Sequence, residues 1–206
     1  MEPISIFRDN PRGVTERLAR ATVGIAGVGG VGSNVAWLLA RAGLGRLIVA
    51  DHDRVEPSNL NRQFYFMDQV SLPKVAALAD NLARIRSGLD IVTHRTMLDR
   101  ESSCRLFAGA DLLVEALDRD VSKIMLLESW MTGLPGVPIV SCSGLAGEGR
   151  SEDVRIDRRE GLTIVGDQTS DLSGGTLSSR VCLVASLMAA EVVSILLRSR
   201  PSGRGR

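Results

Sequence analysis

The chain has 206 residues, of which 44% are hydrophobic and 24% charged, and its net charge is +1. These values are typical of a globular protein with one full-sized core, so we expect a single domain over residues 1–206. The balanced charge gives no electrostatic support for a general nucleic-acid or membrane-surface role. We expect an N-terminal arm at 1–13, a flexible tail at 199–206 and, because no targeting pattern opens the chain, a cytoplasmic location.

Three cysteines, Cys104, Cys142 and Cys182, lie far apart and form no CxxC pair. Neither a disulfide framework nor a zinc site built from cysteines is therefore expected. Cys142 and Cys182 fall in apolar segments, which predicts burial and low reactivity. Cys104 begins a predicted surface helix and is the most accessible of the three.

Apolar runs that alternate with amphipathic segments predict the elements of the first two thirds of the chain. The strands are expected at 22–26, 46–50, 90–93, 111–115 and 138–143, and the helices at 14–20, 31–42, 73–86, 101–107 and 121–131. This alternation indicates a parallel sheet with right-handed crossovers, and strands of continuous apolar character indicate helices on both faces. We therefore expect an α/β fold of Rossmann-like type.

The pattern changes after Gly144. Two short strands at 152–156 and 162–165 are expected to pair antiparallel, as a short C-terminal extension of the sheet. A Gly/Ser-rich loop at 167–176 leads to an apolar segment at 181–197, which is slightly short for a membrane span and is interrupted by Glu191. We expect a buried core helix there, capped by Ser178 or Ser179.

A glycine-rich turn at 27–32 joins the first strand to the next helix. Glycines let the turn tighten and let backbone N–H groups approach a phosphate, and the helix presents its positive N-terminus to the anion. Asp51 ends the next strand, where its carboxylate can accept ribose hydroxyls. The motif does not by itself separate NAD, FAD and ATP, and the alternative is that the glycines serve only close packing. The predicted nucleotide-binding residues are Gly27, Gly29, Gly30, Gly32 and Asp51.

A polar segment follows Asp51 and favours ATP over a dinucleotide. Asp53 precedes the sequence SNLNRQ, which places the amides of Asn59 and Gln63 and the guanidinium of Arg62 beside the ribose end of the pocket. Arginine matches the geometry of phosphate by a bidentate fork. The alternative for Arg62 is an ordinary solvated charge.

Two further charged residues strengthen the case for ATP. Lys74 begins a predicted helix, where an ammonium gains nothing from the helix dipole unless an anion lies there too. Asp118 follows a strand at the carboxyl edge of the sheet and can hold Mg²⁺, although it could instead cap the helix that begins near Asp120. His52 and His94 are poor candidates for the acid or base that a hydride-transfer enzyme needs.

In these residues the sequence resembles the ThiF/MoeB/ubiquitin-activating-enzyme (HesA/MoeB/ThiF) family. The matching stretches are VGIAGVGGVGSNVAWLLARAGLGRLIVADHDRVEPSNLNRQF, LPKV and DLLVEALDRDVSK. The closing stretch RVCLVASLMAAEVVSIL is similar to that of the short, zinc-less ThiF branch, the sulfur carrier protein ThiS adenylyltransferases.

The resemblance implies a homodimeric adenylyltransferase that uses MgATP, without zinc, to activate the C-terminal Gly carboxylate of a small ubiquitin-like sulfur carrier, with thiamine biosynthesis as the pathway. The carboxylate would attack the α-phosphate and release pyrophosphate. By motif, Gly30 lies under the phosphates, Asp51 holds the ribose, and Asn59, Arg62 and Lys74 contact phosphates. Asp118 binds Mg²⁺, and Arg62, Lys74 and Asp118 form the catalytic set.

The sequence departs from the family pattern at two places. Asp118-Arg119 replaces the usual Asp-Asn, and the N-terminal arginine that reaches the ATP of a dimer partner has only Arg8 and Arg12 as candidates. A non-catalytic carrier-binding protein therefore stays open as an alternative, as does an NAD-dependent oxidoreductase that rests on the glycine turn alone.

Overall fold

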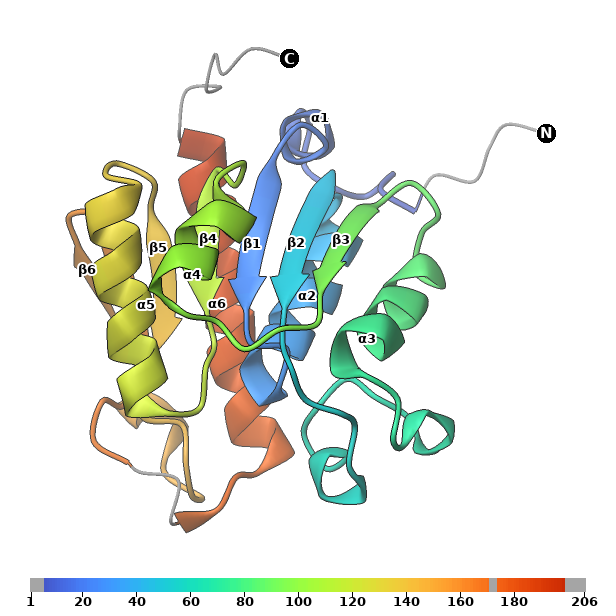
Figure 1. The fold of residues 1–206 in the computed structure, drawn as a ribbon. Coiled ribbons are helices and arrows are strands. Elements are labelled where there is room, and N and C mark those ends of the chain that lie inside the picture. Colours follow the sequence, from blue (N-terminus) through green and yellow to red (C-terminus); the bar gives the residue numbers. More distant parts are fainter. Residues whose placement is uncertain (1–5, 171–173, 199–206) are drawn as a thin grey trace.

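The computed structural model describes residues 6–170 and 174–198 (Figure 1). Its centre is a seven-stranded sheet in the order β3-β2-β1-β4-β5-β7-β6. Every strand is parallel to its neighbours except β6, which pairs antiparallel with β7. The strands are β1 (Thr22–Ala26), β2 (Arg46–Ala50), β3 (Asp90–His94), β4 (Leu112–Glu115), β5 (Ile139–Cys142), β6 (Arg155–Arg159) and β7 (Leu162–Gly166). The predicted Rossmann-like α/β class is confirmed, while the expected tail and the first five residues of the arm lie outside the described residues.

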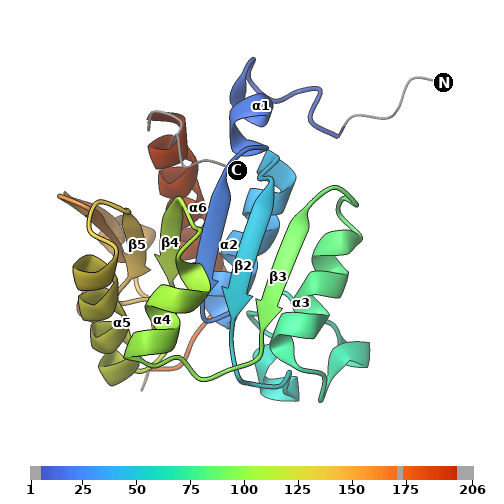
Figure 2. The ribbon, with the colours of Figure 1, turned by 45° about the horizontal axis from the view of Figure 1, so that its top comes forward.

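Helices cover both faces of the sheet, as Figures 1 and 2 show. On one face lie α2 (Gly30–Ala42), α3 (Lys74–Ala83) and α6 (Ser178–Arg198), and on the other lie α4 (Arg100–Phe107) and α5 (Asp120–Gly133). A short helix α1 (Val14–Leu18) precedes β1, and single 3-10 turns lie at η1 (Pro57–Asn59), η2 (Met67–Gln69) and η3 (Ser151–Asp153).

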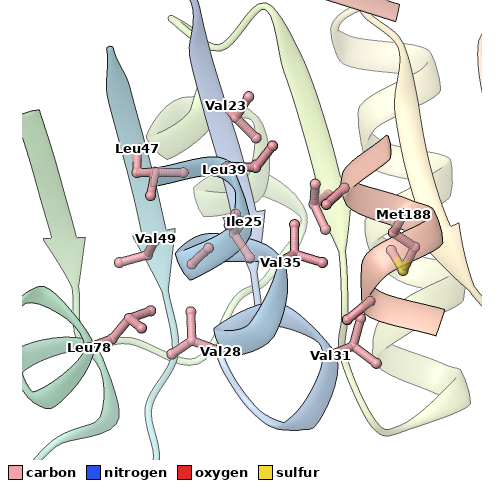
Figure 3. Close-up of a cluster of buried hydrophobic side chains, with 14 of the residues drawn as sticks. Val23, Ile25, Val28, Val31, Val35, Leu39, Leu47, Val49, Leu78 and Met188 are labelled. Carbon is pink, nitrogen blue, oxygen red and sulfur yellow. The ribbon is translucent and has the colours of Figure 1, made fainter. Parts of the chain in front are cut away.

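The larger part of the core lies between the sheet and helices α2, α3 and α6 (Figure 3). Because side chains alternate along a strand, Val23 and Ile25 of β1 enter this core, whereas Ala26 enters the core on the other face. On that other face the ring of Trp130 meets Phe107 edge-on, with the ring centroids 6.4 Å apart. Position 24 on this face accommodates only glycine, because a Cβ there would lie 2.7 Å from the Phe107 ring.

Several boundaries differ from the prediction by a few residues, and two of the differences have a clear cause. The strand expected at 152–156 is β6, which begins at Arg155, and the residues just before it form the turn η3. Arg159 pairs with Leu162 across a two-residue turn in which Gly161 has a φ of 71°, so the turn sets the register of β6. The last helix begins at Ser178, so Ser178 and Ser179 lie within its first turn and not at the capping position before it.

By length and composition, α6 is a helix that could cross a membrane. In the structure it packs along α2 and against strands β4, β5 and β7, and Val184, Ala185 and Met188 are fully buried. Glu191 accepts a bidentate pair of hydrogen bonds from Arg158 of β6. These contacts are those of a core helix, as the sequence predicts.

The described part of the N-terminal arm lies beside the amino ends of the strands, at the top of Figure 1. Asn10 donates to the carbonyl of Ala42 at 3.0 Å, and Gly45 N–H donates to the carbonyl of Leu18. Arg8 and Arg12 are therefore held far from the carboxyl ends of the strands in their own chain, and both side chains are exposed.

Replacement of Gly32 tests how tightly α2 is seated on β1. A Cβ at Gly32 would lie 1.9 Å from the carbonyl oxygen of Gly27, a backbone atom that cannot move aside. We expect Gly32→Ala to lower the free energy of unfolding by about 3 kcal/mol or more, measured by urea denaturation. The control is Gly109→Ala, where a Cβ meets nothing within 4 Å. Equal stability of the two variants would contradict this packing.

Candidate functional site

A cavity of about 630 Å³ lies at the carboxyl ends of β1, β2, β4 and β5, at the lower edge of the sheet in Figure 1. This is the edge at which open α/β sheets bind ligands. Nine of the eleven residues proposed from the sequence line it: Gly27, Gly29, Gly30, Asp51, Asp53, Arg62, Gln63, Lys74 and Asp118. The folded chain therefore brings together segments that are separated by up to 91 positions (118 − 27).

Gly32 and Asn59 are the two proposed residues that do not line the cavity. Gly32 serves the close contact of α2 with Gly27 described above, so its function is packing. Asn59 is buried, and its side-chain oxygen accepts a hydrogen bond from Glu56 N–H at 3.2 Å, which closes the turn η1. The side chain of Asn59 thus shapes the loop that carries Arg62, and its contact with a phosphate stays a prediction.

Asp51 joins the glycine turn to the end of β2. One carboxylate oxygen accepts from Val28 N–H at 2.8 Å, and the other accepts from Asp53 N–H at 2.8 Å. Each oxygen keeps a further lone pair for a ligand hydroxyl. Tyr65 also stabilises the glycine turn, because its hydroxyl donates to the carbonyl of Val28 at 2.7 Å. Burial, followed by the carboxylates of Asp51 and Asp53, raises the pKa of Tyr65 well above its usual value, so this donor stays protonated.

Lys74 is buried, and its ammonium makes an ion pair with Asp53 at 2.8 Å. The helix that carries it begins at Lys74 itself, with Pro73 at the capping position, one residue outside the position expected. His52 Nε2 lies 3.2 Å from the other oxygen of Asp53. Asp53 therefore neutralises Lys74 and sets its position in the cavity wall.

Arg62 is held next to the glycine turn by Asn34 of α2. The Asn34 amide donates to the carbonyl of Gly30 at 2.6 Å and to the carbonyl of Arg62 at 2.8 Å. One nitrogen of the Arg62 guanidinium donates to the carbonyl of Ser58 and to the Asn61 side chain. Gln63 is buried beside Gly29, and its Oε1 is a buried acceptor without a hydrogen-bond partner.

Asp118 is exposed at the cavity and makes no ion pair or hydrogen bond to another described residue. The residue before α5 is Arg119, and no side chain caps that helix, so the alternative role of Asp118 as a cap is excluded. A free carboxylate of this kind is a ligand that Mg²⁺ accepts. Arg119, which the sequence analysis singled out beside Asp118, also lines the cavity.

The sequence analysis missed a buried polar cluster at the ends of β4 and β5. Glu115 is fully buried and accepts hydrogen bonds from Lys123, from the Ser141 hydroxyl at 2.6 Å and from Leu117 N–H at 2.8 Å. A charged residue at the end of the apolar run DLLVE was the available signal. A second signal was Lys123 itself, a cation in the first turn of a helix like Lys74.

The far wall of the cavity is formed by the residues that follow β5 and β7. Asp167 accepts from the backbone of Thr169 and Ser170 and makes a buried ion pair with Arg180 of α6 at 2.7 Å. Burial alone raises the pKa of Asp167, but these hydrogen bonds outweigh it and hold the pKa well below the usual value. Gln168 beside it has a φ of 61°, in the left-handed region that few side chains adopt.

The three cysteines are free and differ in their surroundings. Cys142 is buried in the cavity wall, and burial raises the pKa of its thiol to about 11, with Lys123 opposing and Glu115 adding to the shift. Burial also raises the pKa of Cys182. Cys104 is part-buried between α4 and α5, where its thiol donates to the carbonyl of Ser129 at 3.2 Å, so it is less accessible than the sequence suggested.

The family model described as the ThiF family matches residues 4–205. The chain belongs to the ThiF family. Among curated proteins, "Adenylyltransferase and sulfurtransferase MOCS3" of Anopheles gambiae is 30% identical over 204 residues, which cover 92% of this chain and 44% of that protein. "Ubiquitin-like modifier-activating enzyme 5" of Drosophila sechellia is 49% identical over 79 residues, which cover 38% of this chain and 20% of that protein. The chain thus spans less than half the length of these relatives.

Solved structures agree with the fold. The E. coli tRNA N6-threonylcarbamoyladenosine dehydratase TcdA, in complex with ATP, superposes with a TM-score of 0.85 at 18% identity and covers 97% of this chain and 95% of that one. E. coli MccB with ATP gives a TM-score of 0.70 at 21% identity, over 92% of this chain and 60% of that one. At such identities the likeness establishes the ThiF-type fold and not the substrate.

The raised pKa of Cys142 predicts that its thiol reacts slowly with alkylating reagents. A thiol with a pKa of about 11 is almost wholly protonated at pH 8, and only the thiolate is nucleophilic. In the native protein we expect iodoacetamide to alkylate Cys142 more slowly than Cys182 at pH 8, with the rate for Cys142 still rising between pH 9 and about pH 11. Site-resolved mass spectrometry measures this, and Cys142 labelling as fast as in urea-unfolded chain would contradict the assigned burial.

Proposed function

We propose that the chain is an ATP-dependent adenylyltransferase that activates the C-terminal Gly carboxylate of a small ubiquitin-like sulfur carrier of the ThiS type. The observation that carries the proposal is the single cavity that joins the glycine turn to Arg62, Lys74 and Asp118. Membership of the ThiF family and a relative whose name includes adenylyltransferase support it.

The nucleotide half of the cavity suits ATP. Gly29 and Gly30, at the N-terminus of α2, would face the phosphates with their backbone N–H groups, with Arg62 and Lys74 as adjacent cations. Asp51, which lines the same part of the cavity, would accept the ribose hydroxyls. Beside it, apolar side chains that include Met97 and Leu98 form a surface for the base.

Asp118 is the residue that would hold Mg²⁺, because it is a free carboxylate at the cavity. Bound Mg²⁺ supplies positive charge to the phosphates in this class of reaction. The chain's own residues bind and orient the substrates. A carboxylate is already a nucleophile, so the protein needs to place it in line with the α-phosphate and to neutralise the developing charge.

In the reaction, a carboxylate oxygen of the carrier forms a bond to the α-phosphorus. The bond from the α-phosphorus to the oxygen that bridges to the β-phosphate breaks, and its electron pair leaves with pyrophosphate. The product is an acyl-adenylate at the C-terminus of the carrier. No proton transfer to or from the carboxylate is required.

The partner we propose is a carrier that ends in Gly-Gly, in thiamine biosynthesis. Support comes from the relatives, one named a sulfurtransferase and one named a ubiquitin-like modifier-activating enzyme. The chain would act in the cytoplasm, without zinc, as a homodimer. Arg8 and Arg12 lie at the opposite end of the sheet from their own cavity, so a contribution from either to catalysis would have to come from a partner subunit.

Nucleotide choice is tested by thermal shift. A ligand at about 100 times its dissociation constant stabilises the native state by about 2.7 kcal/mol. We expect MgATP to raise the melting temperature clearly, and NADH at the same concentration to leave it unchanged. A shift with NADH alone would favour an oxidoreductase and contradict the proposal.

Pyrophosphate exchange tests the reaction. With a Gly-Gly-ending carrier, we expect the wild type to exchange pyrophosphate into ATP and expect Arg62→Ala and Asp118→Asn each to lower the rate by about 100-fold or more. Arg84→Ala and Asp68→Asn are matched controls, since both residues are exposed and outside the cavity wall.

The unfolding midpoints of all four variants should stay close to that of the wild type. Full exchange by either cavity variant would refute the role of that residue. ATP binding by the wild type without exchange would instead favour a non-catalytic carrier-binding protein.

A further inference from the structure

Lysine is confined to the cavity in this chain. The sequence has 25 basic residues, of which only Lys74 and Lys123 are lysines. Both line the cavity and each is paired with a carboxylate, Asp53 for one and Glu115 for the other. Arginine supplies the positive charge at every other basic position. A compact ammonium on a flexible stem differs from a planar guanidinium. We therefore infer that these two positions require an ammonium, whereas arginine suffices on the surface.

Lys123 is held in place from behind, on the side away from the cavity. Its side chain is 17% exposed, and Glu115, which is fully buried, accepts its hydrogen bond. Glu115 has two other donors, Ser141 and Leu117 N–H, so its carboxylate is anchored independently of the lysine. Burial alone lowers the pKa of Lys123, but Cys142 and Glu115 outweigh it, and the pKa stands above its usual value.

The ammonium retains donors for a ligand. An ammonium has three N–H groups, and among the described residues Glu115 takes one, while the Cys142 sulfur, a weak acceptor, lies 4.0 Å away. At least one donor is thus left on a mostly buried cation at the cavity wall. An anionic acceptor in the cavity would satisfy it.

The position of Lys123 distinguishes this anion from the phosphates. The glycine turn, Arg62 and Lys74 belong to the part of the cavity at β1 and β2, whereas Lys123 lies over the ends of β4 and β5. Asp118, Arg119 and Asp120 line the cavity beside Lys123 at the start of α5, whereas the wall across from them, after β5 and β7, carries no charged side chain among the described lining residues and suits a neutral peptide end. That wall consists of Cys142, Ser143, Gly144, Leu145, Gln168, Thr169, Ser170 and Thr176.

We propose that Lys123 is the cation that receives the carboxylate of the acyl substrate and aims it at the α-phosphate, with Glu115 as the residue that positions Lys123. The inference rests on the proposed function, because it assigns the part of the cavity that would bind the acyl substrate, here called the acyl half. Lys123 transfers no proton in the step. It binds one carboxylate oxygen while the other forms the bond to phosphorus and pyrophosphate leaves.

The test separates the acyl half from the nucleotide half. The probes are MgATP and 5′-O-[N-(glycylglycyl)sulfamoyl]adenosine, a stable mimic of a Gly-Gly acyl-adenylate, with dissociation constants measured by calorimetry. Because Lys123→Met alone strands the buried Glu115 charge and could unfold the chain, the main variant is the double change Glu115→Gln with Lys123→Met.

We expect the double variant to bind the acyl mimic at least about 30-fold more weakly than the wild type, the loss of one charged hydrogen bond. Its affinity for MgATP should stay within about threefold, since that half of the site is separate. Lys123→Arg keeps the positive charge but replaces the compact ammonium by a planar guanidinium, so it should bind the mimic more weakly than the wild type and more tightly than the double variant. Glu115→Gln alone should weaken the mimic less than the double variant, because it leaves the ammonium in place.

Unchanged affinity of the double variant for the mimic, or equal losses for the mimic and MgATP, would overturn the assignment of Lys123. If the proposed function itself is wrong, the wild-type chain already gives a different set of binding and exchange results. A wild-type chain that binds MgATP but exchanges no pyrophosphate with Gly-Gly carriers, and binds the mimic no better than AMP, would refute adenylation and the acyl assignment with it.

Discussion

The carboxylate of Asp51 is the contact on which the rest of the site depends. It accepts the N–H groups of Val28 and Asp53, so one side chain fixes the glycine turn and the first residue of the following loop relative to each other. From Asp53 the chain of contacts runs to Lys74. From Val28 it runs through its carbonyl to Tyr65. A charged acceptor makes such hydrogen bonds about twice as strong as neutral ones, and the buried side chains of Val28 and Val31 hold the same turn against the core.

This arrangement explains why several conspicuous polar residues do not face the cavity. Asn59 closes a turn, and Asn34 ties the carbonyls of Gly30 and Arg62 together. Both side-chain amides make hydrogen bonds to backbone groups of the segments that surround the cavity, and so they hold those segments in place. The polar motif SNLNRQ is thus divided between residues that build the loop and residues that meet a ligand, and spacing alone does not tell one from the other.

Much of the fold follows from the sequence, because the signals there are local. The apolar runs of β1 and β2 are bounded by glycine or aspartate, and their predicted limits agree with the structure to the residue. The start of β6 could not be read in this way, since its register is set by the turn at Gly161 and by pairing with β7. The nucleotide site was predicted for a similar local reason, since Asp51 and Asp118 follow strand ends and the glycine turn follows the first strand.

The cluster at Glu115 shows where sequence reasoning stops. Its partners come from β5 and α5, so only the tertiary fold reveals that a charge at the end of an apolar strand is paired. The same holds for Asp167, whose pairing with Arg180 joins β7 to α6 across a loop. A buried charge is tolerated only with a partner, and the identity of that partner is a property of the fold.

The walls of the cavity differ in polarity from one side to the other. Charged side chains of both signs gather at the glycine turn, with Arg62 and Lys74, and at the start of α5, with Asp118 and Lys123, whereas the described lining residues that follow β5 and β7 are uncharged. A triphosphate needs cations, and a neutral peptide end needs none. Under the proposed function, the nucleotide would therefore lie against the glycine turn and the acyl group along the wall that follows β5 and β7, and the two would meet at the start of α5.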